Sequence, residues 1–242
     1  MIITFLGTRG YVDITSRRHK HHTSTMIMHH NKRIMIDCGQ DWLKKIFRIK
    51  PDAIILTHSH PDHAAGLAYG APCPVYATRQ TWHAIKDYLI DPELRHTIKR
   101  TQSFKLFGVI ITPISVVHSL LAPAIAYRIE AQNHIVFYSG DIAYMPKRAK
   151  QLKHVTLYIG DGSTLSTPLI RKKDDRIYGH TTIKTQLAWC RKSGVERAIF
   201  THLGTPLIQA DGRKLSATIK KIGKQRGVNV RVAYDGLTIK SI

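Results

Sequence analysis

The segment Thr57–His63, THSHPDH, constrains this chain more than any other, because it places four possible metal ligands within six residues. It directly follows an apolar strand predicted at Ile54–Leu56. Imidazoles two residues apart in an extended segment point the same way, and an aspartate and a histidine at the start of a following helix can face the same cavity. The segment is therefore predicted to serve two adjacent metal ions.

The hydrophobic pattern predicts strands first and helices interleaved with strands afterwards. We expect strands near Ile2–Leu6, Thr25–Met28, Arg33–Ile36, Ala53–Leu56, Val109–Val116, Ala124–Ile129, His134–Tyr138, Ala198–Thr201, Asn229–Ala233 and Leu237–Lys240. Helical spacing predicts helices at Gln80–Leu89, Thr182–Lys192 and Lys214–Lys224. No stretch reads as a linker or a repeat, so the prediction is a layered α/β protein with one domain, residues 1–242.

Basic residues exceed acidic ones, with 37 Lys and Arg against 16 Asp and Glu, which gives a formal net charge of +21. A field of this sign attracts phosphate-bearing partners, although a generally basic, solvated surface would give the same count. No apolar run approaches the roughly 20 residues that cross a bilayer, and Met1–Arg9 lacks the features of an export signal. We therefore expect a cytoplasmic protein without a membrane partner.

Three further polar residues stand where apolar strands end: His118, Asp141 and His202. Taken singly, each would be read as a turn or capping residue. Taken in order after the histidine-rich segment, they form a set of possible metal ligands.

The ordered motifs resemble those of metallo-β-lactamase-fold hydrolases, from Ile2 to Lys240. The match rests on Asp37 in IDCG, the segment HSHPDH, His118, Asp141 in YSGD and His202 in THLG. The resemblance implies a four-layer αβ/βα sandwich with the metals at one edge of the packed sheets. It also implies that one metal is held by His58, His60 and His118 and the second by Asp62, His63 and His202, with Asp141 bridging and Asp37 supporting a ligand or the bridging water.

Imidazole and carboxylate ligands suit two divalent ions, zinc or manganese, and the sequence does not choose between them. Two ions roughly 3.5 to 4 Å apart can share a hydroxide that attacks at neutral pH. We therefore expect a metal-dependent hydrolase with a bridging hydroxide as nucleophile.

A narrower resemblance points to the phosphodiesterase branch, which includes tRNase Z and the cyclic-phosphate phosphodiesterase of phosphonate breakdown. It rests on GHTT at Gly179–Thr182 and on the segments FLGTRG, LYIGDGS and VAYDGLTI. A histidine such as His180 can bind a phosphoryl oxygen or protonate the leaving oxygen, or it can simply cap the following helix. Catalytic roles are predicted for His180, Asp37 and Asp62. Asp161 is the weaker candidate, as a residue that orients His180 or a ligand.

The chain also departs from those relatives. Only 22 residues separate His118 from Asp141, where tRNase Z inserts a long tRNA-binding arm. The interval from Asp141 to His202 is too short for the β-CASP domain of other nucleic-acid processing enzymes, and the cysteine-rich zinc site of some cyclic-phosphate phosphodiesterases is missing. What remains is a compact phosphodiesterase.

We therefore expect a nuclease acting on DNA or RNA. Basic residues in loops flanking the site are predicted to hold substrate phosphates: Arg17, Arg18, Lys20, Arg171, Lys172 and Lys173. The alternatives are a small-molecule hydrolase acting on a cyclic phosphodiester or lactone, and a nucleic-acid-binding protein whose metal site is structural. The sequence leaves open a homodimer through the helices near Trp82 and Trp189, although both indoles are expected in the core.

Overall fold

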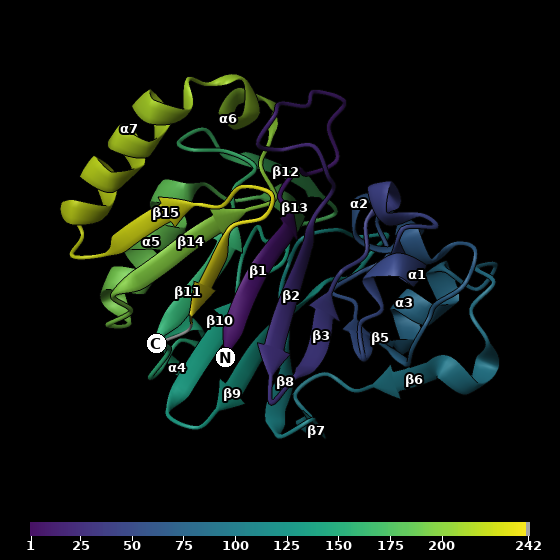
Figure 1. Ribbon diagram of the computed structural model, residues 1–242. Helices are drawn as coiled ribbons and strands as arrows, with labels where there is room; N and C mark the ends of the chain where they lie inside the picture. The colour runs from purple at the N-terminus through teal and green to yellow at the C-terminus, as the bar shows by residue number, and fades with distance from the viewer. Residues whose placement is uncertain (241–242) are drawn as a thin grey trace.

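Two seven-stranded sheets face each other in the computed structural model, which describes residues 1–240 (Figure 1). The first sheet has the order β16-β1-β2-β3-β4-β5-β6, with strands β1 (Ile2–Gly7), β2 (Ser24–His29), β3 (Lys32–Ile36), β4 (Ala53–Ile55), β5 (Val75–Thr78), β6 (Arg95–Ile98) and β16 (Thr238–Lys240). The second has the order β15-β14-β11-β10-β9-β8-β7, with strands β7 (Phe104–Leu106), β8 (Val109–Ser115), β9 (Ile125–Ala131), β10 (His134–Tyr138), β11 (Leu157–Asp161), β14 (Arg197–Thr201) and β15 (Asn229–Val232).

Helices lie on the outer faces of the two sheets and at one edge of the sandwich. They are α1 (Ile46–Ile49), α2 (Pro61–Ala64), α3 (Arg79–Ala84), α4 (Arg148–Gln151), α5 (Ile183–Lys192), α6 (Thr205–Gln209) and α7 (Gly212–Lys224), with short 3₁₀ turns at Gln40–Trp42, Ala65–Leu67 and Pro92–Leu94. Figure 1 places α1 and α3 beside the first sheet and α5 and α7 beside the second. No helix within residues 1–240 is both long and apolar enough to cross a membrane.

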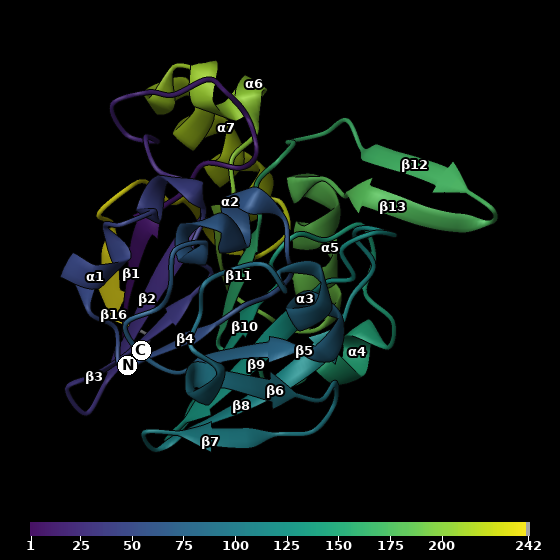
Figure 2. The same ribbon diagram turned by 90° about the vertical axis from the view of Figure 1, so that its right-hand side faces the viewer.

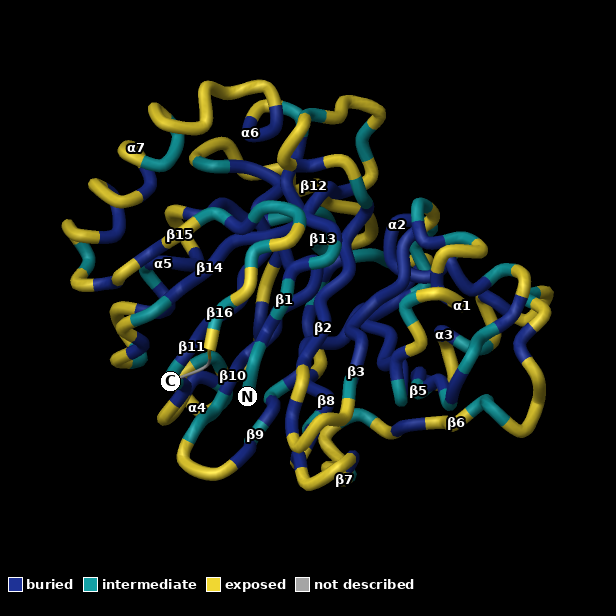
Figure 3. The backbone as a smooth tube through the Cα atoms, viewed as in Figure 1, coloured by how far each residue is buried: buried dark blue, intermediate teal, exposed yellow. Residues whose placement is uncertain are grey.

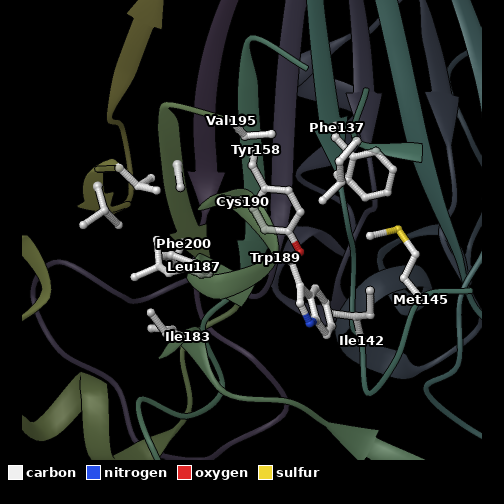
Figure 4. Packing of buried hydrophobic residues seen from close by; sticks show 14 of the residues in the cluster. Phe137, Ile142, Met145, Tyr158, Ile183, Leu187, Trp189, Cys190, Val195 and Phe200 are labelled. Atoms are coloured by element: carbon white, nitrogen blue, oxygen red, sulfur yellow. The ribbon is translucent and has the colours of Figure 1, made fainter. Parts of the chain in front are cut away.

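Alternating side chains divide the core into three apolar layers. In β10, Val136 and Tyr138 pack between the two sheets, whereas Phe137 packs on the other face of its sheet against residues of α5. β11 repeats the pattern, because Tyr158 joins the outer layer beneath α5 (Figure 4). A third apolar cluster, which includes Ile46 of α1, lies on the outer face of the first sheet. Three apolar layers require four layers of structure, so the expected αβ/βα sandwich is confirmed.

α7 has one buried apolar face and a capped N-terminus. Ile219 and Ile222 are buried against the second sheet, while the other face of the helix is exposed (Figure 3). Asp211 begins the helix, because its side chain accepts hydrogen bonds from the backbone N–H groups of Arg213 and Lys214. An apolar stripe with a capped start explains why this segment is helical.

Strand direction brings the polar residues together. β3, β4 and β5 run parallel in the first sheet, and β10, β11 and β14 run parallel in the second. β8 has the same direction as β10, since both pair antiparallel with β9. Residues that follow these strands therefore meet at one edge of the sandwich, where ligands bind in open α/β sheets.

The segment after β5 differs from its prediction. A helix was expected over Gln80–Leu89, but α3 ends at Ala84. The N–H of Leu89 donates to the carbonyl oxygen of Ala68, so the chain turns to meet another segment, and the Leu89 side chain is 70% exposed. A tertiary hydrogen bond overrides the helical spacing here.

A two-stranded hairpin was not predicted. It consists of β12 (Leu169–Lys173) and β13 (Arg176–His180), and it projects from the body of the molecule beside α5 (Figure 2). Arg171, Lys172 and Lys173 were expected in a loop, but they lie in β12. All five residues of β12 are exposed, so the sequence carries no alternation of buried and exposed positions that would mark the strand.

Candidate metal centre

The histidine-rich segment changes from strand to helix at Pro61. β4 ends at Ile55, and His60 retains extended backbone angles of φ −61° and ψ 150°. Pro61 then begins α2, which suits a proline because the first helical N–H has no partner within the helix. Asp62 and His63 in this helix are buried beside His58. The predicted local geometry is thus present.

Three histidines from two segments form the first group of possible ligands. His58 Nε2 lies 3.0 Å from His60 Nδ1, which in turn lies 3.2 Å from Nε2 of His118, the third residue after β8. Asp141 Oδ2 approaches this group, at 3.7 Å from His58 Nε2 and 3.4 Å from His118 Nε2. These four residues can surround one cation.

The second group lies on the other side of the same carboxylate. His202 Nε2 is 2.9 Å from Asp62 Oδ2, and His63 Nε2 is 3.3 Å from that oxygen. Asp141 Oδ1 lies 3.1 Å from His63 Nε2 and 3.2 Å from His202 Nε2. Asp141 therefore presents one oxygen to each group, and the two groups share it.

The donor atoms fit two metal ions. Donors about 2.1 Å from a tetrahedral ion lie roughly 3.4 Å apart, close to the separations of these nitrogens and oxygens. Three buried atoms, Asp62 Oδ1, His63 Nε2 and Asp141 Oδ1, have no hydrogen-bond partner. Buried polar atoms are normally satisfied, so buried donor atoms left without hydrogen bonds in these residues are what a cation site requires.

Neighbouring groups fix the ring nitrogen that each histidine presents. His118 Nδ1 donates to the carbonyl oxygen of Gly179 at 3.1 Å, and His63 Nδ1 donates to Asp37 Oδ2 at 2.8 Å. His202 Nδ1 lies 2.9 Å from Ser163 Oγ. Each of these rings is left with Nε2 facing its group, as expected of histidines that ligate a metal.

Burial and neighbouring charges shift histidine pKa values in opposite directions in the two groups. Burial lowers the pKa of His118 to about 4, despite the attraction of Asp141. Burial also acts to lower the pKa of His202, but Asp141 and hydrogen bonds to Asp161 and Asp62 raise it to about 10. At neutral pH, His118 is ready to bind a cation, whereas binding at His202 would release a proton.

His180 stands beside both groups. Its Nδ1 lies 2.7 Å from Oδ2 of the buried Asp161, and it is also 3.1 Å from Ser163 Oγ, which leaves Nε2 available to a substrate. Burial acts to lower the pKa of His180, but Asp161 raises it. The capping alternative is wrong, because the side chain of Thr182 accepts from the Thr185 N–H and begins α5.

A family model described as a beta-lactamase superfamily domain matches residues 32–203. That span begins at β3 and contains every residue of both groups. The chain belongs to the beta-lactamase superfamily. Membership supports a metal-dependent hydrolase and implies divalent metal ions, which the two His and Asp groups suit.

Solved structures share the superfamily fold with this chain. The metallo-beta-lactamase fold protein YhfI from Bacillus subtilis matches with a TM-score of 0.77 and 18% identity, over 98% of both chains. A diphosphatase from the PhnP family matches with a TM-score of 0.71 and 20% identity, over 99% of this chain and 97% of that one. Ribonuclease Z of Bradyrhizobium diazoefficiens is 36% identical over 70 residues, which are 27% of this chain and 22% of that protein.

Asp37 lies behind the second group of possible ligands. Its carboxylate accepts from the N–H of Thr57 at 2.7 Å and from His63 Nδ1 at 2.8 Å, and it is fully buried. Asp37 therefore holds both the start of the histidine-rich segment and the ring of His63.

Replacing Asp37 with asparagine is expected to lower metal affinity about 10- to 100-fold, because an amide cannot accept from both partners as a carboxylate does. Competition with a fluorescent zinc chelator measures the change. Asp52→Asn, at the opposite end of β4, is the matched control and is expected to bind metal as the wild type does. Unchanged affinity in Asp37→Asn would refute the orienting role.

A cavity of about 680 Å³ opens in front of the two groups; we call it the metal-centre cavity. His60, Asp62, His118, Asp141, His180 and His202 line it, but among the described residues no lysine or arginine does. Arg17 and Arg18 instead border a separate cavity. Lys20 is exposed in the loop between β1 and β2, where its backbone N–H donates to Asp235. The structure does not bring the six predicted basic residues onto the metal ligands.

Ser163 and Thr57 are site residues that sequence reasoning missed. Ser163 Oγ donates to Asp161 Oδ1 at 2.6 Å and links Asp161, His180 and His202. Thr57 Oγ1 contacts Asp37 and lies 3.0 Å from His58 Nδ1. The only sequence signal was position: Ser163 ends the LYIGDGS motif, and Thr57 precedes the first histidine.

Proposed function

We propose that this chain is a dinuclear metal-dependent phosphodiesterase that cleaves nucleic acid, DNA or RNA. The observation that carries the proposal is His180, held by the buried Asp161 beside two groups of metal ligands that share Asp141. The paired groups suit hydrolysis in general. The additional histidine suits a phosphodiester, because such esters place charge on non-bridging oxygens and release an alkoxide.

His58, His60 and His118 would hold one divalent ion, Asp62, His63 and His202 a second, and Asp141 both. Zinc or manganese bound there would supply a nucleophilic hydroxide at neutral pH and would neutralise phosphoryl oxygens. Asp37 and Asp161 hold the ligand rings in place, and the buried walls around them limit access of water.

His180 has the geometry of a group that meets the substrate. With Nδ1 committed to Asp161, its Nε2 can donate to a phosphoryl oxygen or pass a proton to the leaving oxygen. Ser163 fixes the pair by contacting both residues. The chain thus offers a positioned proton donor on the wall of the metal-centre cavity.

The charge of the chain favours a polymeric substrate. A formal net charge of +21 supplies many cations outside the metal-centre cavity, and a polyanion is the partner that can use them. We propose that Arg17, Arg18 and Lys20 and the hairpin residues Arg171, Lys172 and Lys173 contact phosphates away from the cleaved bond. The local identity to a ribonuclease Z supports the same substrate class.

One observation favours a second candidate, a hydrolase of small cyclic phosphodiesters or lactones. The metal-centre cavity has an apolar wall that includes Val12, Leu165 and Leu169, and Tyr11 at this wall is 67% exposed. Such a wall can hold the uncharged part of a small substrate. Dependence of the rate on substrate length separates the two candidates.

The proposal is tested by incubating end-labelled single-stranded and duplex DNA and RNA with the wild-type protein and with Asp62→Ala, in added manganese or zinc. Cleavage by the wild type alone is expected, and the fragment pattern separates endonuclease from exonuclease action. Hydrolysis of a small cyclic or aryl phosphodiester with no polymer cut would establish the second candidate in place of ours.

Salt should weaken cleavage of the polymer steeply. Each phosphate contact to a single strand contributes a slope of about −0.7 in log affinity against log salt. Two or three contacts therefore predict that KM for an oligonucleotide rises roughly 10-fold between about 50 and 200 mM salt. Turnover of bis(p-nitrophenyl) phosphate, measured in the same buffers, is the control and is expected to change little. Equal salt dependence for both substrates would contradict a role for the basic surface.

A further inference from the structure

A second cavity, of about 560 Å³, lies between α6, α7, β15 and the loop that joins β1 to β2; we call it the basic cavity. Four cationic residues border it: Arg17 and Arg18 from the loop, Lys220 from α7 and Arg231 from β15. No aspartate or glutamate within residues 1–240 lines it. Figure 1 shows the loop passing close to α6 at the top of the view.

The four charges have no neutralising partners among the described residues. None of them forms an ion pair there, and Arg18 instead stacks on the ring of Tyr234, with its guanidinium carbon 4.2 Å from the ring centroid. The carboxylate of the next residue, Asp235, accepts hydrogen bonds from Thr8 Oγ1 and from two backbone N–H groups. Like charges around one cavity repel each other, so an anion bound among them is favoured.

The basic cavity adjoins the metal-centre cavity. α6 forms the wall between them: Thr205 and Pro206 face the metal-centre cavity, Ile208 faces the basic cavity, and Leu207 borders both. A ligand confined to the metal-centre cavity meets no lysine or arginine, whereas one that continues over α6 meets four such residues.

We propose that the basic cavity binds a backbone phosphate of the nucleic-acid strand whose scissile phosphodiester lies at the metal centre. This subsite rests on the proposed function for the identity of the strand. It assigns Lys220 and Arg231 a role that their sequence positions do not suggest. A nucleic acid fits because its phosphates recur along one chain, so a single molecule can occupy both cavities.

The test compares two double variants that each remove two positive charges. Lys220→Ala with Arg231→Ala alters the basic cavity, and Lys221→Ala with Lys224→Ala alters exposed residues of α7 outside it. Lys220 and Arg231 are exposed as well, so both pairs should leave the fold intact. Binding of a fluorescein-labelled single strand of about 20 nucleotides is followed by anisotropy in EDTA, so that no cleavage intervenes.

The altered basic cavity is expected to weaken strand binding roughly 10-fold at moderate salt and to reduce the slope of log Kd against log salt by about 0.7, the value for one phosphate that is no longer neutralised. The α7 control is expected to change Kd less than about twofold. Equal losses in the two variants would overturn the subsite, since the effect would then be general charge.

Inorganic phosphate separates a strand subsite from a site for the free ion. At matched ionic strength, phosphate should not displace the strand from the wild type; displacement by millimolar phosphate would overturn the assignment to nucleic acid.

Cleavage of the same strand by the metal-loaded wild type is measured separately. Equal cleavage of the strand by the two double variants would overturn the subsite alone. Binding that depends on the subsite, with no cleavage by the wild type, would overturn the phosphodiesterase alone.

Discussion

Asp141→Ala is expected to lower phosphodiester turnover about 10³-fold. Asp141 is the one residue that presents an oxygen to each ligand group, at 3.1 Å from His63 Nε2 and 3.4 Å from His118 Nε2. Its loss leaves three histidines on one side and His63, His202 and Asp62 on the other, with no carboxylate between them. Bound metal should therefore fall below two ions per chain.

Metal analysis of the purified protein, together with the hydrolysis rate of bis(p-nitrophenyl) phosphate, measures both effects. Burial acts to raise the pKa of Asp141, but electrostatic attraction to His202, His63 and His118 holds it well below its usual range. Asp52→Ala, at the amino end of β4, is the matched control and should retain both metal and activity. Two bound ions with full activity in Asp141→Ala would refute the bridging role.

His180→Ala is expected to lower kcat about 10²- to 10⁴-fold on a nucleic acid while leaving metal content unchanged. His180 is part of the wall of the metal-centre cavity, and its Nδ1 is held by Asp161. It belongs neither to the group that contains His58 nor to the group that contains His63. The loss arises because an alkoxide leaving oxygen needs a proton as the bond to phosphorus breaks.

The leaving group provides the decisive comparison. p-Nitrophenolate leaves without protonation, so His180→Ala should lose far less activity on bis(p-nitrophenyl) phosphate than on an oligonucleotide. Asp161→Asn should reproduce the same pattern more weakly, because it removes the carboxylate at 2.7 Å from His180 Nδ1. An equal loss on both substrates would contradict proton donation to the leaving oxygen.

The convergence of these residues was predictable from the sequence because strand ends are a local signal. Asp141 follows β10 and His202 follows β14, and in each case an apolar run stops at a polar residue. Parallel strands bring their carboxyl ends to one edge, so the order of these residues along the chain was enough to predict their convergence. Asp161, the weaker candidate, was predictable only as a strand end, and its hydrogen bond to His180 required the structure.

The remaining features depend on contacts between distant segments. The β12–β13 hairpin has no buried face to mark it, and α3 ends early because Leu89 bonds to Ala68. The basic cavity joins Arg18 to Arg231 across more than two hundred residues of sequence. Patterns within one segment cannot report such contacts.

The most direct test of a dinuclear metal-dependent phosphodiesterase is a metal titration of activity. Zinc or manganese is added stepwise to EDTA-treated wild-type protein, and the initial rate of bis(p-nitrophenyl) phosphate hydrolysis is followed against the molar ratio of metal to protein. A dinuclear centre should give no hydrolysis without metal and a rate that reaches its plateau at two ions per chain. Hydrolysis that is independent of metal, a plateau at one ion, or no hydrolysis at any ratio would contradict it.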